Sequence, residues 1–373
     1  MGPMRRFYAS AAPDRELIAG YRRVTSPTLD RGVRVRRSGS PSVVAMFLRR
    51  LAIGLLTLLL LPALLLTYAR LAERSGGFWV RLVALTPFAA GLYALALLLL
   101  LLACWRAGGR LRSAAKALAV LSAFGLVLHL AWISDAYVGP AGASAKEGGT
   151  FRVMTANLML GGADTSRVVA TALDHEVDVL VLEEVTPQAL QRLRAAGLAK
   201  AYPHSAGKPA DGPVGTMVFA RGRISGVRRI GTGFESYAMR VRVAGESVAL
   251  LAVHPRTPLG DARDWASDLN AVRTAAVAQD GPTLVVGDFN ATLDHLPMRD
   301  LRGRGFEDAA TTARSRWQPT WPAAGEVQVL GVAVPSLLAL DHVLVDGGLH
   351  GVRTESVEIS GTDHRAVVAI LSR

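Results

Sequence analysis

The sequence has almost no cysteine: Cys104 is the only one among 373 residues. A single thiol cannot form an intramolecular disulfide, and it cannot build a zinc site of the Cys-rich kind. A disulfide framework and a zinc-finger-like domain are therefore excluded. Any bound metal must rely on oxygen and imidazole ligands, which favours a hard cation such as Mg²⁺ or Mn²⁺.

Acidic residues are scarce in the first 150 positions, which hold 6 of the 30 Asp and Glu but 19 of the 42 Lys and Arg. The rest of the chain carries 24 acids and 23 bases, so the net charge of +12 belongs to the N-terminal part. A pI near 10.6 would by itself favour nucleic-acid binding. Because the C-terminal part is near neutral, the charge argues against tight, nonspecific binding to a DNA duplex.

Charged residues are absent from three apolar runs, residues 51–68, 82–105 and 117–134. Each run has 18 to 24 residues, which is enough for a helix to cross a hydrocarbon core of about 30 Å. Because backbone polar groups in lipid must be satisfied within the segment, the runs predict three transmembrane helices. The chain is therefore expected to be a multi-pass protein of the cell membrane.

The sequence divides into four predicted regions: a disordered, basic, cytoplasmic tail (1–43), a membrane anchor (44–136), a Gly/Ala/Ser-rich linker (137–149) and a soluble domain (150–373). Positive charges concentrate in the loop after the second apolar run, at Arg106, Arg110, Arg112 and Lys116. Since basic loops stay on the cytoplasmic side, the soluble domain is predicted to lie outside the cytoplasm.

The soluble domain alternates β-rich runs with helical stretches, which predicts a mixed sheet system with helices outside. The predicted strands are 151–156, 177–182, 216–220, 238–243, 248–253, 283–286, 342–345 and 366–370, and the predicted helices are 165–174, 187–196, 261–279 and 297–301. Polar residues stand where these strands begin or end: Asn157, Glu183, Glu184, His254, Asp288, Asn290, Asp341, His342, Asp363 and His364. Loops at the ends of rigid strands are where proteins place catalytic groups.

The motifs TANL, LEEV, AVHP, VVGDFN, LDHVLV and GTDH occur in this order over roughly residues 150–373. As a set they resemble the endonuclease/exonuclease/phosphatase superfamily, whose fold is a four-layer α/β sandwich of two packed sheets flanked by helices. The HPRTP and PTWP stretches resemble a bacterial, membrane-anchored branch. The expected architecture is therefore this sandwich preceded by three transmembrane helices.

The resemblance implies a metal site and a catalytic dyad. Glu184 would be the main metal ligand, Asn157 would complete the site or position the phosphate, and Asp363 would bind the metal or its water. Asp341 would orient His364, which would deprotonate water or contact the phosphate.

Further roles follow from the same resemblance. Asp288 would orient the attacking water, Asn290 would donate to the phosphoryl oxygen, and His254 would donate to the phosphate or the leaving oxygen. Arg240 would contact the phosphate. In some relatives the first histidine pairs with an upstream acid, but here only Asp211 stands in the corresponding stretch.

Two neighbouring residues receive structural interpretations. Glu183 occupies the family's Gln position and is expected to be a solvated residue on the turn. His342 is expected to have a packing role.

The predicted function is a membrane-anchored, divalent-metal-dependent phosphoester hydrolase that acts on nucleic acid or phospholipid next to the bilayer. No obligate protein partner is evident. A lipid phosphodiesterase of the sphingomyelinase type is an alternative, and so is a catalytically silent membrane protein that keeps the fold. A transporter would need ionisable groups inside the spans, and only His129 qualifies.

Overall fold

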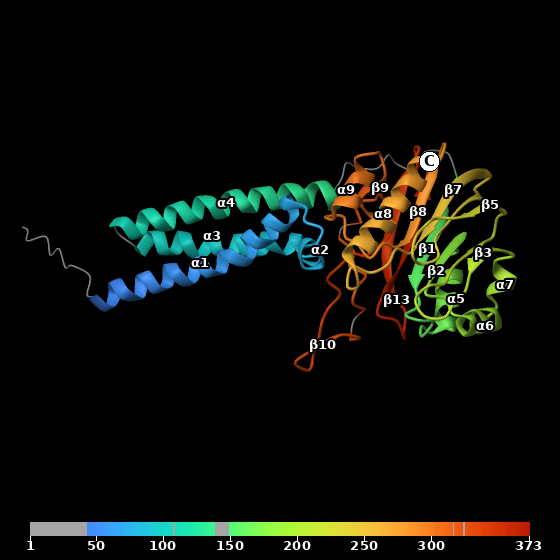
Figure 1. Cartoon of the computed structure of the whole chain (residues 1–373), viewed down its shortest axis with the longest axis horizontal. Coiled ribbons are helices and arrows are strands. Elements are labelled where there is room, and N and C mark those ends of the chain that lie inside the picture. Colours follow the sequence, from blue (N-terminus) through green and yellow to red (C-terminus); the bar gives the residue numbers. More distant parts are fainter. Residues whose placement is uncertain (1–42, 107–108, 139–148, 316, 324) are drawn as a thin grey trace, which may run out of the picture. The chain divides into compact units, whose positions relative to one another are not determined.

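Two six-stranded mixed sheets form the body of the C-terminal region (Figure 1). In the computed structural model, residues 43–106, 109–138, 149–315, 317–323 and 325–373 are described. The first sheet has the order β13-β14-β1-β2-β4-β3, with β1 Phe151–Asn157, β2 Val179–Glu183, β3 His204–Lys208, β4 Thr216–Ala220, β13 His350–Glu358 and β14 Arg365–Ser372. The second has the order β5-β6-β7-β8-β12-β9, with β5 Ile224–Arg229, β6 Tyr237–Val243, β7 Glu246–Val253, β8 Thr283–Asp288, β9 Glu307–Asp308 and β12 Asp341–Asp346.

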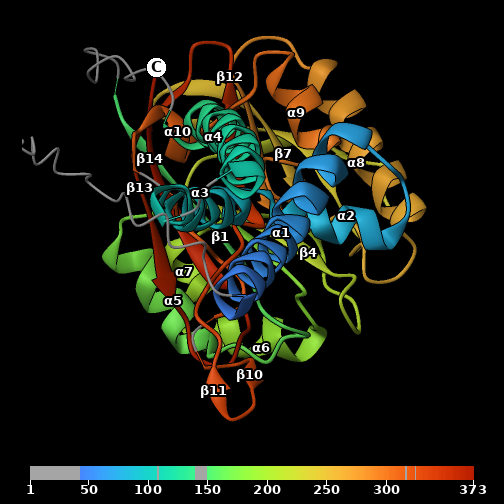
Figure 2. The same cartoon turned by 90° about the vertical axis from the view of Figure 1, so that its left-hand side faces the viewer.

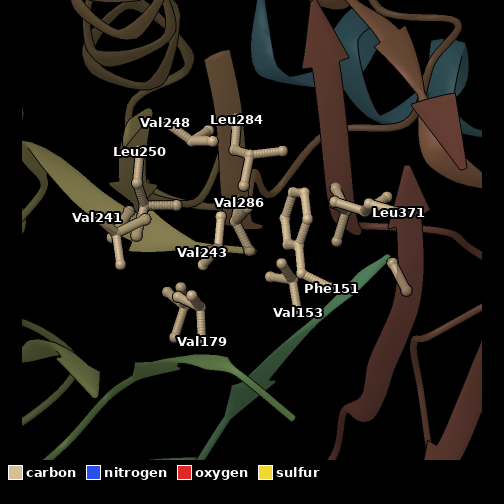
Figure 3. Close-up of a cluster of buried hydrophobic side chains, with 14 of the residues drawn as sticks. Phe151, Val153, Val179, Val241, Val243, Val248, Leu250, Leu284, Val286 and Leu371 are labelled. Carbon is tan, nitrogen blue, oxygen red and sulfur yellow. The ribbon is translucent and has the colours of Figure 1, made fainter. Parts of the chain in front are cut away.

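The two sheets pack face to face through aliphatic side chains. Figure 3 shows Val153 and Val179 of the first sheet opposite Leu250 and Val286 of the second. Side chains alternate along a strand, so the neighbouring Met154 points away from this core into a separate apolar cluster. Each central strand therefore buries both faces, which explains its near-continuous Val, Leu and Ala sequence.

Helices cover the outer faces of both sheets. Their bounds are α5 Thr165–Asp174, α6 Pro187–Ala195, α7 Leu198–Ala201, α8 Ala262–Val277, α9 Leu296–Arg302 and α10 Ala309–Thr312. Helices α5, α6 and α7 pack on the first sheet, and α8 and α9 on the second. Side-chain N-caps start four of them, because Asp164 at α5, Thr186 at α6, Asp261 at α8 and Asp308 at α10 each accept a backbone N–H. The predicted α/β sandwich is confirmed.

Two pairs of parallel strands end at the edge of the sandwich where the predicted site residues lie. β1 runs parallel to β2, and β7 runs parallel to β8. The carboxyl ends of each pair therefore lie side by side and are followed by polar residues of the predicted site. Gly287 permits the close approach of β7 and β8, since a Cβ there would lie 2.0 Å from Val253 O.

The N-terminal region is helical, but it differs from the prediction of three transmembrane helices. It comprises α1 Val43–Ala72, α2 Gly77–Ala84, the 3-10 helix η1 Thr86–Phe88, α3 Ala89–Arg106 and α4 Gly109–Tyr137. Among the described residues two helical segments are long and apolar enough to cross a membrane, Thr86–Trp105 and Gly109–Tyr137. The first predicted run lies in α1, whose described apolar part is only Leu60–Ala72. The predicted tail (1–43) and linker (137–149) fall almost wholly outside the described residues.

The four edge strands of the two sheets, β3, β5, β9 and β13, were not predicted from the sequence. The exposed β5 reads ISGVRR, β3 reads HSAGK and β13 reads HGVRTESVE. Edge strands with one solvated face carry charged and polar residues, so they lack the aliphatic runs that identified the central strands. A further short hairpin, β10 Gln328–Val329 and β11 Val332–Ala333, stands outside both sheets (Figure 2).

Candidate active site

Three buried titratable side chains meet at one edge of the sandwich: Asp288, Asp341 and His364. One ligand atom from each lies within 4.8 Å of the others. His364 Nδ1 lies 2.8 Å from Asp341 Oδ2, and the imidazole N–H donates this bond to the carboxylate. His364 Nε2 is 3.7 Å from Asp288 Oδ2. The bond to Asp341 thus holds the ring with its second nitrogen facing Asp288.

The Asp288 carboxylate is the centre of the cluster. Its Oδ2 accepts a hydrogen bond from Asn157 Nδ2 at 3.0 Å and lies 3.7 Å from His254 Nε2. Its Oδ1 accepts from the backbone N–H of Asn290 at 2.8 Å. Asn290 has φ 48°, a left-handed conformation in which asparagine is enriched, so the chain turns back directly after β8. Four predicted site residues, counting His364, therefore surround one carboxylate.

Asn157 connects this carboxylate to Glu184. The same Asn157 Nδ2 lies 3.2 Å from Glu184 Oε1, and the backbone N–H of Leu160 donates to Glu184 Oε2 at 2.5 Å. Glu184 has φ 55° directly after β2. A positive φ is uncommon for a residue with a side chain, and such conformations cluster at functional sites. The strand ends thus bring the predicted ligands Glu184 and Asn157 next to the buried cluster.

The predicted ligand Asp363 is held by a residue to which the sequence assigned no role. Trp321 Nε1 donates to Asp363 Oδ2 at 3.1 Å. The preceding Thr320 accepts from the backbone N–H of Asp341 through its Oγ1 at 3.2 Å. Thr320 and Trp321 therefore contact both Asp341, the partner of His364, and Asp363, the residue before His364. The PTWP motif was the available signal, but sequence alone does not show what the indole contacts.

Buried charge sets the electrostatics of the cluster. Burial alone would lower the pKa of His364, but the charges of Asp341 and Asp288 outweigh it and raise the pKa to about 10. Burial raises the pKa of Asp288 although both histidines oppose the shift, and burial lowers the pKa of His254. His364 is therefore cationic at neutral pH before any metal binds, which favours contact with a phosphate over abstraction of a proton.

Glu183 corrects the sequence interpretation. It was expected to be solvated, but its side chain is fully buried behind the cluster. Thr155 Oγ1 donates to Glu183 Oε1 at 2.8 Å, while Oε2 has no hydrogen-bonding partner among the described residues. Burial, reinforced by the charge of Asp341, raises the pKa of Glu183 well above its ordinary value. Because side chains alternate along a strand, Glu183 lies on the same face of β2 as Val179 and Val181, which points between the sheets.

The donor set fits a divalent cation. Asp288 and Asp341 are two buried carboxyl groups beside one cationic imidazole, that of His364. Asp341 Oδ1 is buried and has no hydrogen-bonding partner among the described residues. Such an excess of carboxylate oxygen is costly without positive charge, and Mg²⁺ or Mn²⁺ would supply it. Oxygen ligands are available from Asp288 and Asp341 and from the Glu184–Asn157 corner, and His364 could join them only as the neutral imidazole.

Two other predicted residues lie apart from the cluster. Arg240 is half-buried on β6, and its guanidinium donates to Ser247 Oγ and Ser247 O. Ser247 is near the start of β7, whereas His254 follows its end, so the structure gives the phosphate-contact prediction for Arg240 no support. His342 is buried, with Nδ1 2.6 Å from Asp308 and Nε2 facing carbonyl oxygens, in agreement with a packing role.

His254 joins the cluster without an acidic partner of its own. Its backbone N–H donates to Ser236 Oγ, and the Phe234 ring packs against the imidazole at 5.1 Å between centroids. Its Nδ1 has no hydrogen-bonding partner of normal geometry in the described part of the chain. Asp211, which the sequence offered as the acid, is exposed. The acid facing His254 is instead Asp288.

Comparison with solved structures identifies the same fold in other proteins. TDP2 of D. rerio, in a crystal structure with a single-strand DNA product, aligns over 60% of this chain and 99% of its own, with 15% identity and a TM-score of 0.50. A family protein from Leptotrichia buccalis covers 60% of this chain and all of its own at 11% identity, with a TM-score of 0.45. SmcL covers 60% of this chain and 99% of its own at 16% identity, with a TM-score of 0.46. At these identities the likeness establishes the fold alone.

No curated protein matches the chain. The model of the Endonuclease/Exonuclease/phosphatase family matches residues 154–364, more than half of the sequence. The match runs from within β1 to the histidine of the buried cluster and so spans every site residue described above. The chain belongs to the endonuclease/exonuclease/phosphatase family.

Proposed function

We propose that the chain is a divalent-metal-dependent phosphoester hydrolase whose active site is the Asp288–Asp341–His364 cluster with the adjoining Glu184 and Asn157. The observation that supports this most is the burial of several carboxyl groups and one charged imidazole at a strand-end edge, an arrangement that needs a cation. Family membership gives the reaction class, hydrolysis at phosphorus.

Glu184 and Asn157, with Asp363, would hold Mg²⁺ or Mn²⁺, as the motifs predict. When bound, the cation would neutralise phosphate charge and polarise the phosphoryl group. Asn157 already bonds both Glu184 and Asp288, so it would couple the ligand corner to the buried cluster. Trp321 fixes the orientation of Asp363 by its hydrogen bond.

The remaining residues act on the water and the phosphate. Asp288 would orient the attacking water and accept its proton, since burial raises the pKa of this carboxyl and makes it a stronger base. His364, held by Asp341, would present a cationic Nε2 to the phosphate. His254 would contact the phosphate or the leaving oxygen from the other side of Asp288. Asn290, fixed by its bond to Pro255 O, would donate its second amide hydrogen to the phosphoryl oxygen.

Membrane anchoring is part of the proposal. The segments Thr86–Trp105 and Gly109–Tyr137 have the length and composition of membrane spans, and the basic residues Arg106, Arg110, Arg112 and Lys116 stand in and just after the loop that joins them. With that loop in the cytoplasm, both outer ends of the pair lie on the other side. The catalytic domain follows the second span and would therefore be extracytoplasmic. The orientation can be tested with a reporter that works only in the cytoplasm, fused after Arg373. Activity of that reporter would contradict an extracytoplasmic domain.

The test is hydrolysis by the full chain in detergent micelles. We expect Mg²⁺ or Mn²⁺ to support hydrolysis of bis-p-nitrophenyl phosphate and EDTA to abolish it, with recovery when the metal is restored. A panel of single-stranded DNA, duplex DNA, RNA, sphingomyelin, other phospholipids and phosphomonoesters then defines the substrate. A chain that hydrolyses none of these with either metal would be the silent protein of the alternative interpretation.

A further inference from the structure

The hairpin of β10 and β11 exposes apolar side chains at its tip. Val329, Leu330 and Val332 are 58%, 99% and 69% exposed. Residues 327–340, which read VQVLGVAVPSLLAL, contain no charged side chain. Single exposed apolar residues are ordinary on soluble proteins, but a projecting tip made of them within an uncharged stretch of this length is not. Both views show this hairpin outside the two sheets (Figures 1 and 2).

The turn itself is built against the usual preference. Leu330 and Gly331 are the two turn residues between the paired Val329 and Val332, and both have positive φ, 52° and 78°. A two-residue turn of this kind favours Asn, Asp or Gly at its first position. For a bulky residue a positive φ is an outlier. A leucine in this place is both strained and fully solvated, so neither the fold nor the solubility of the hairpin explains it.

The segment that carries the hairpin is attached to the candidate membrane spans at one end. Trp317 and Phe88 pack edge to face with ring centroids 5.7 Å apart. Phe88 lies at the start of the span Thr86–Trp105. Tryptophan is enriched where membrane helices leave the hydrocarbon core, so this contact is typical of the level of the lipid headgroups.

The same segment is attached to the active site at its other contacts. Trp321 bonds the Asp363 carboxylate, and its backbone pairs with Leu338 across the base of the hairpin. Thr320 Oγ1 accepts from the backbone N–H of Leu340 and of Asp341. Residues 317–341 thus connect the end of a membrane span, an apolar tip and two acids of the site within one short stretch of chain.

We propose that Leu330, with Val329 and Val332, inserts into the lipid bilayer to which the chain is anchored, so that the active site acts on phosphoesters in the headgroups of membrane lipids. This inference rests on the proposed function and names its substrate class. The apolar tip is expected to bind the bilayer surface. The Trp317–Phe88 contact places residues 317–341 beside the candidate span Thr86–Trp105 of the same chain.

The first experiment measures insertion without requiring activity. Leu330→Cys in a Cys104→Ala background is labelled with an environment-sensitive fluorophore, and the full chain is reconstituted into phosphatidylcholine vesicles. Lipids that carry a quencher in the upper acyl chain are expected to quench the label and shift its emission to the blue. Leu173→Cys, labelled in the same background, is the matched control, since Leu173 is exposed on α5 and has no part in the segment. Equal, weak quenching at both positions would overturn the proposal.

The second experiment tests the link to the substrate with Leu330→Asn. Asparagine suits the positive φ better than leucine does, so this variant keeps or stabilises the hairpin while it removes the apolar side chain. The rate on a phosphoester lipid in vesicles, divided by the rate on bis-p-nitrophenyl phosphate, is expected to fall about tenfold, as loss of one buried leucine implies. An unchanged ratio would overturn the substrate class.

The outcomes separate the two proposals. A chain that inserts the label but hydrolyses no phosphoester contradicts the proposed function and leaves insertion supported. A chain that hydrolyses the soluble ester but shows no quenching contradicts the insertion alone. The unlabelled Leu330→Cys variant is also oxidised in vesicles. Disulfide-linked dimers through the introduced thiol would show that the tip binds a second copy of the chain, and they would overturn the proposed insertion into the bilayer.

Discussion

The strand-end cluster and the β10–β11 hairpin reverse the ordinary distribution of side chains in opposite ways. The cluster buries Asp288, Asp341 and His364, whereas the hairpin exposes Leu330 and its neighbours. Burying charge and exposing hydrocarbon are both unfavourable in an isolated soluble domain. Each departure is explained by a binding partner, a cation for the first and a lipid surface for the second.

The largest expected effect comes from removing the charged imidazole. His364→Asn should lower the rate on bis-p-nitrophenyl phosphate by about a thousandfold, within the range for loss of one group that stabilises charge in the transition state. His204→Asn is the matched control, since His204 is half-buried on β3 away from the cluster. A loss of less than tenfold would show that the buried cluster is not the reactive centre.

The pH dependence of stability should reveal the buried charge directly. The pKa of His364 is raised to about 10 from 6.5, so its contribution to the metal-free protein is complete below pH 6.5 and is lost as the pH rises through about 10. Each pKa unit is worth about 1.4 kcal/mol, so the loss should be a few kcal/mol. Thermal unfolding in EDTA, compared between the wild type and His364→Gln from pH 6 to 10, measures it. Parallel curves for the two proteins would refute the assignment.

A smaller effect is expected at Glu183, where two substitutions separate the contribution of the negative charge from that of the buried hydrogen bond. Because burial raises its pKa, the side chain is expected to be neutral, and Glu183→Gln should keep both stability and activity within a few-fold. Glu183→Ala leaves Thr155 Oγ1 without its buried partner and should cost about 1–3 kcal/mol in the free energy of unfolding. If the glutamine variant is as unstable as the alanine variant, the carboxyl is ionised in the folded protein.

The smallest predicted change concerns the segment that joins the two regions. Trp321→Phe removes one hydrogen bond to Asp363 and keeps an aromatic ring. A hydrogen bond to a charged group is worth about 1.5–3 kcal/mol, so the concentration of Mg²⁺ needed for half-maximal activity should rise by about tenfold or somewhat more. Unaltered Mg²⁺ dependence would show that the indole does not position this carboxylate.

The central sheet strands were predictable from sequence because they bury both faces. The aliphatic runs that became β1, β2, β7 and β8 have bounds within a few residues of the predicted ones. The edge strand β5 was not found, since its exposed ISGVRR sequence has no apolar alternation. Among the described residues only two helical segments are long and apolar enough to cross a membrane, so the third span predicted from the 51–68 run is not found there.

The site was predictable to the extent that its residues follow strands. Asn157, His254 and Asp288 meet because parallel strands end at a common edge, and His364 joins them because it directly precedes β14, which runs antiparallel to β1. Sequence could not show that Glu183 points inward while Glu184 turns to the site. That choice depends on the pairing of β2 and on the positive φ at Glu184.

Cation binding tests the central claim most directly, because the buried cluster is explained only if it holds a cation with its neighbours. Mn²⁺ titrated into the metal-free full chain, with free Mn²⁺ followed by its electron paramagnetic resonance signal, measures binding without any assumption about substrate. The account predicts that the wild type binds Mn²⁺ in competition with Mg²⁺, and that Glu184→Gln binds it at least tenfold more weakly, as loss of an oriented carboxylate ligand implies. A wild type that leaves the Mn²⁺ signal unchanged, or a Glu184→Gln variant that binds as tightly as the wild type, would contradict it.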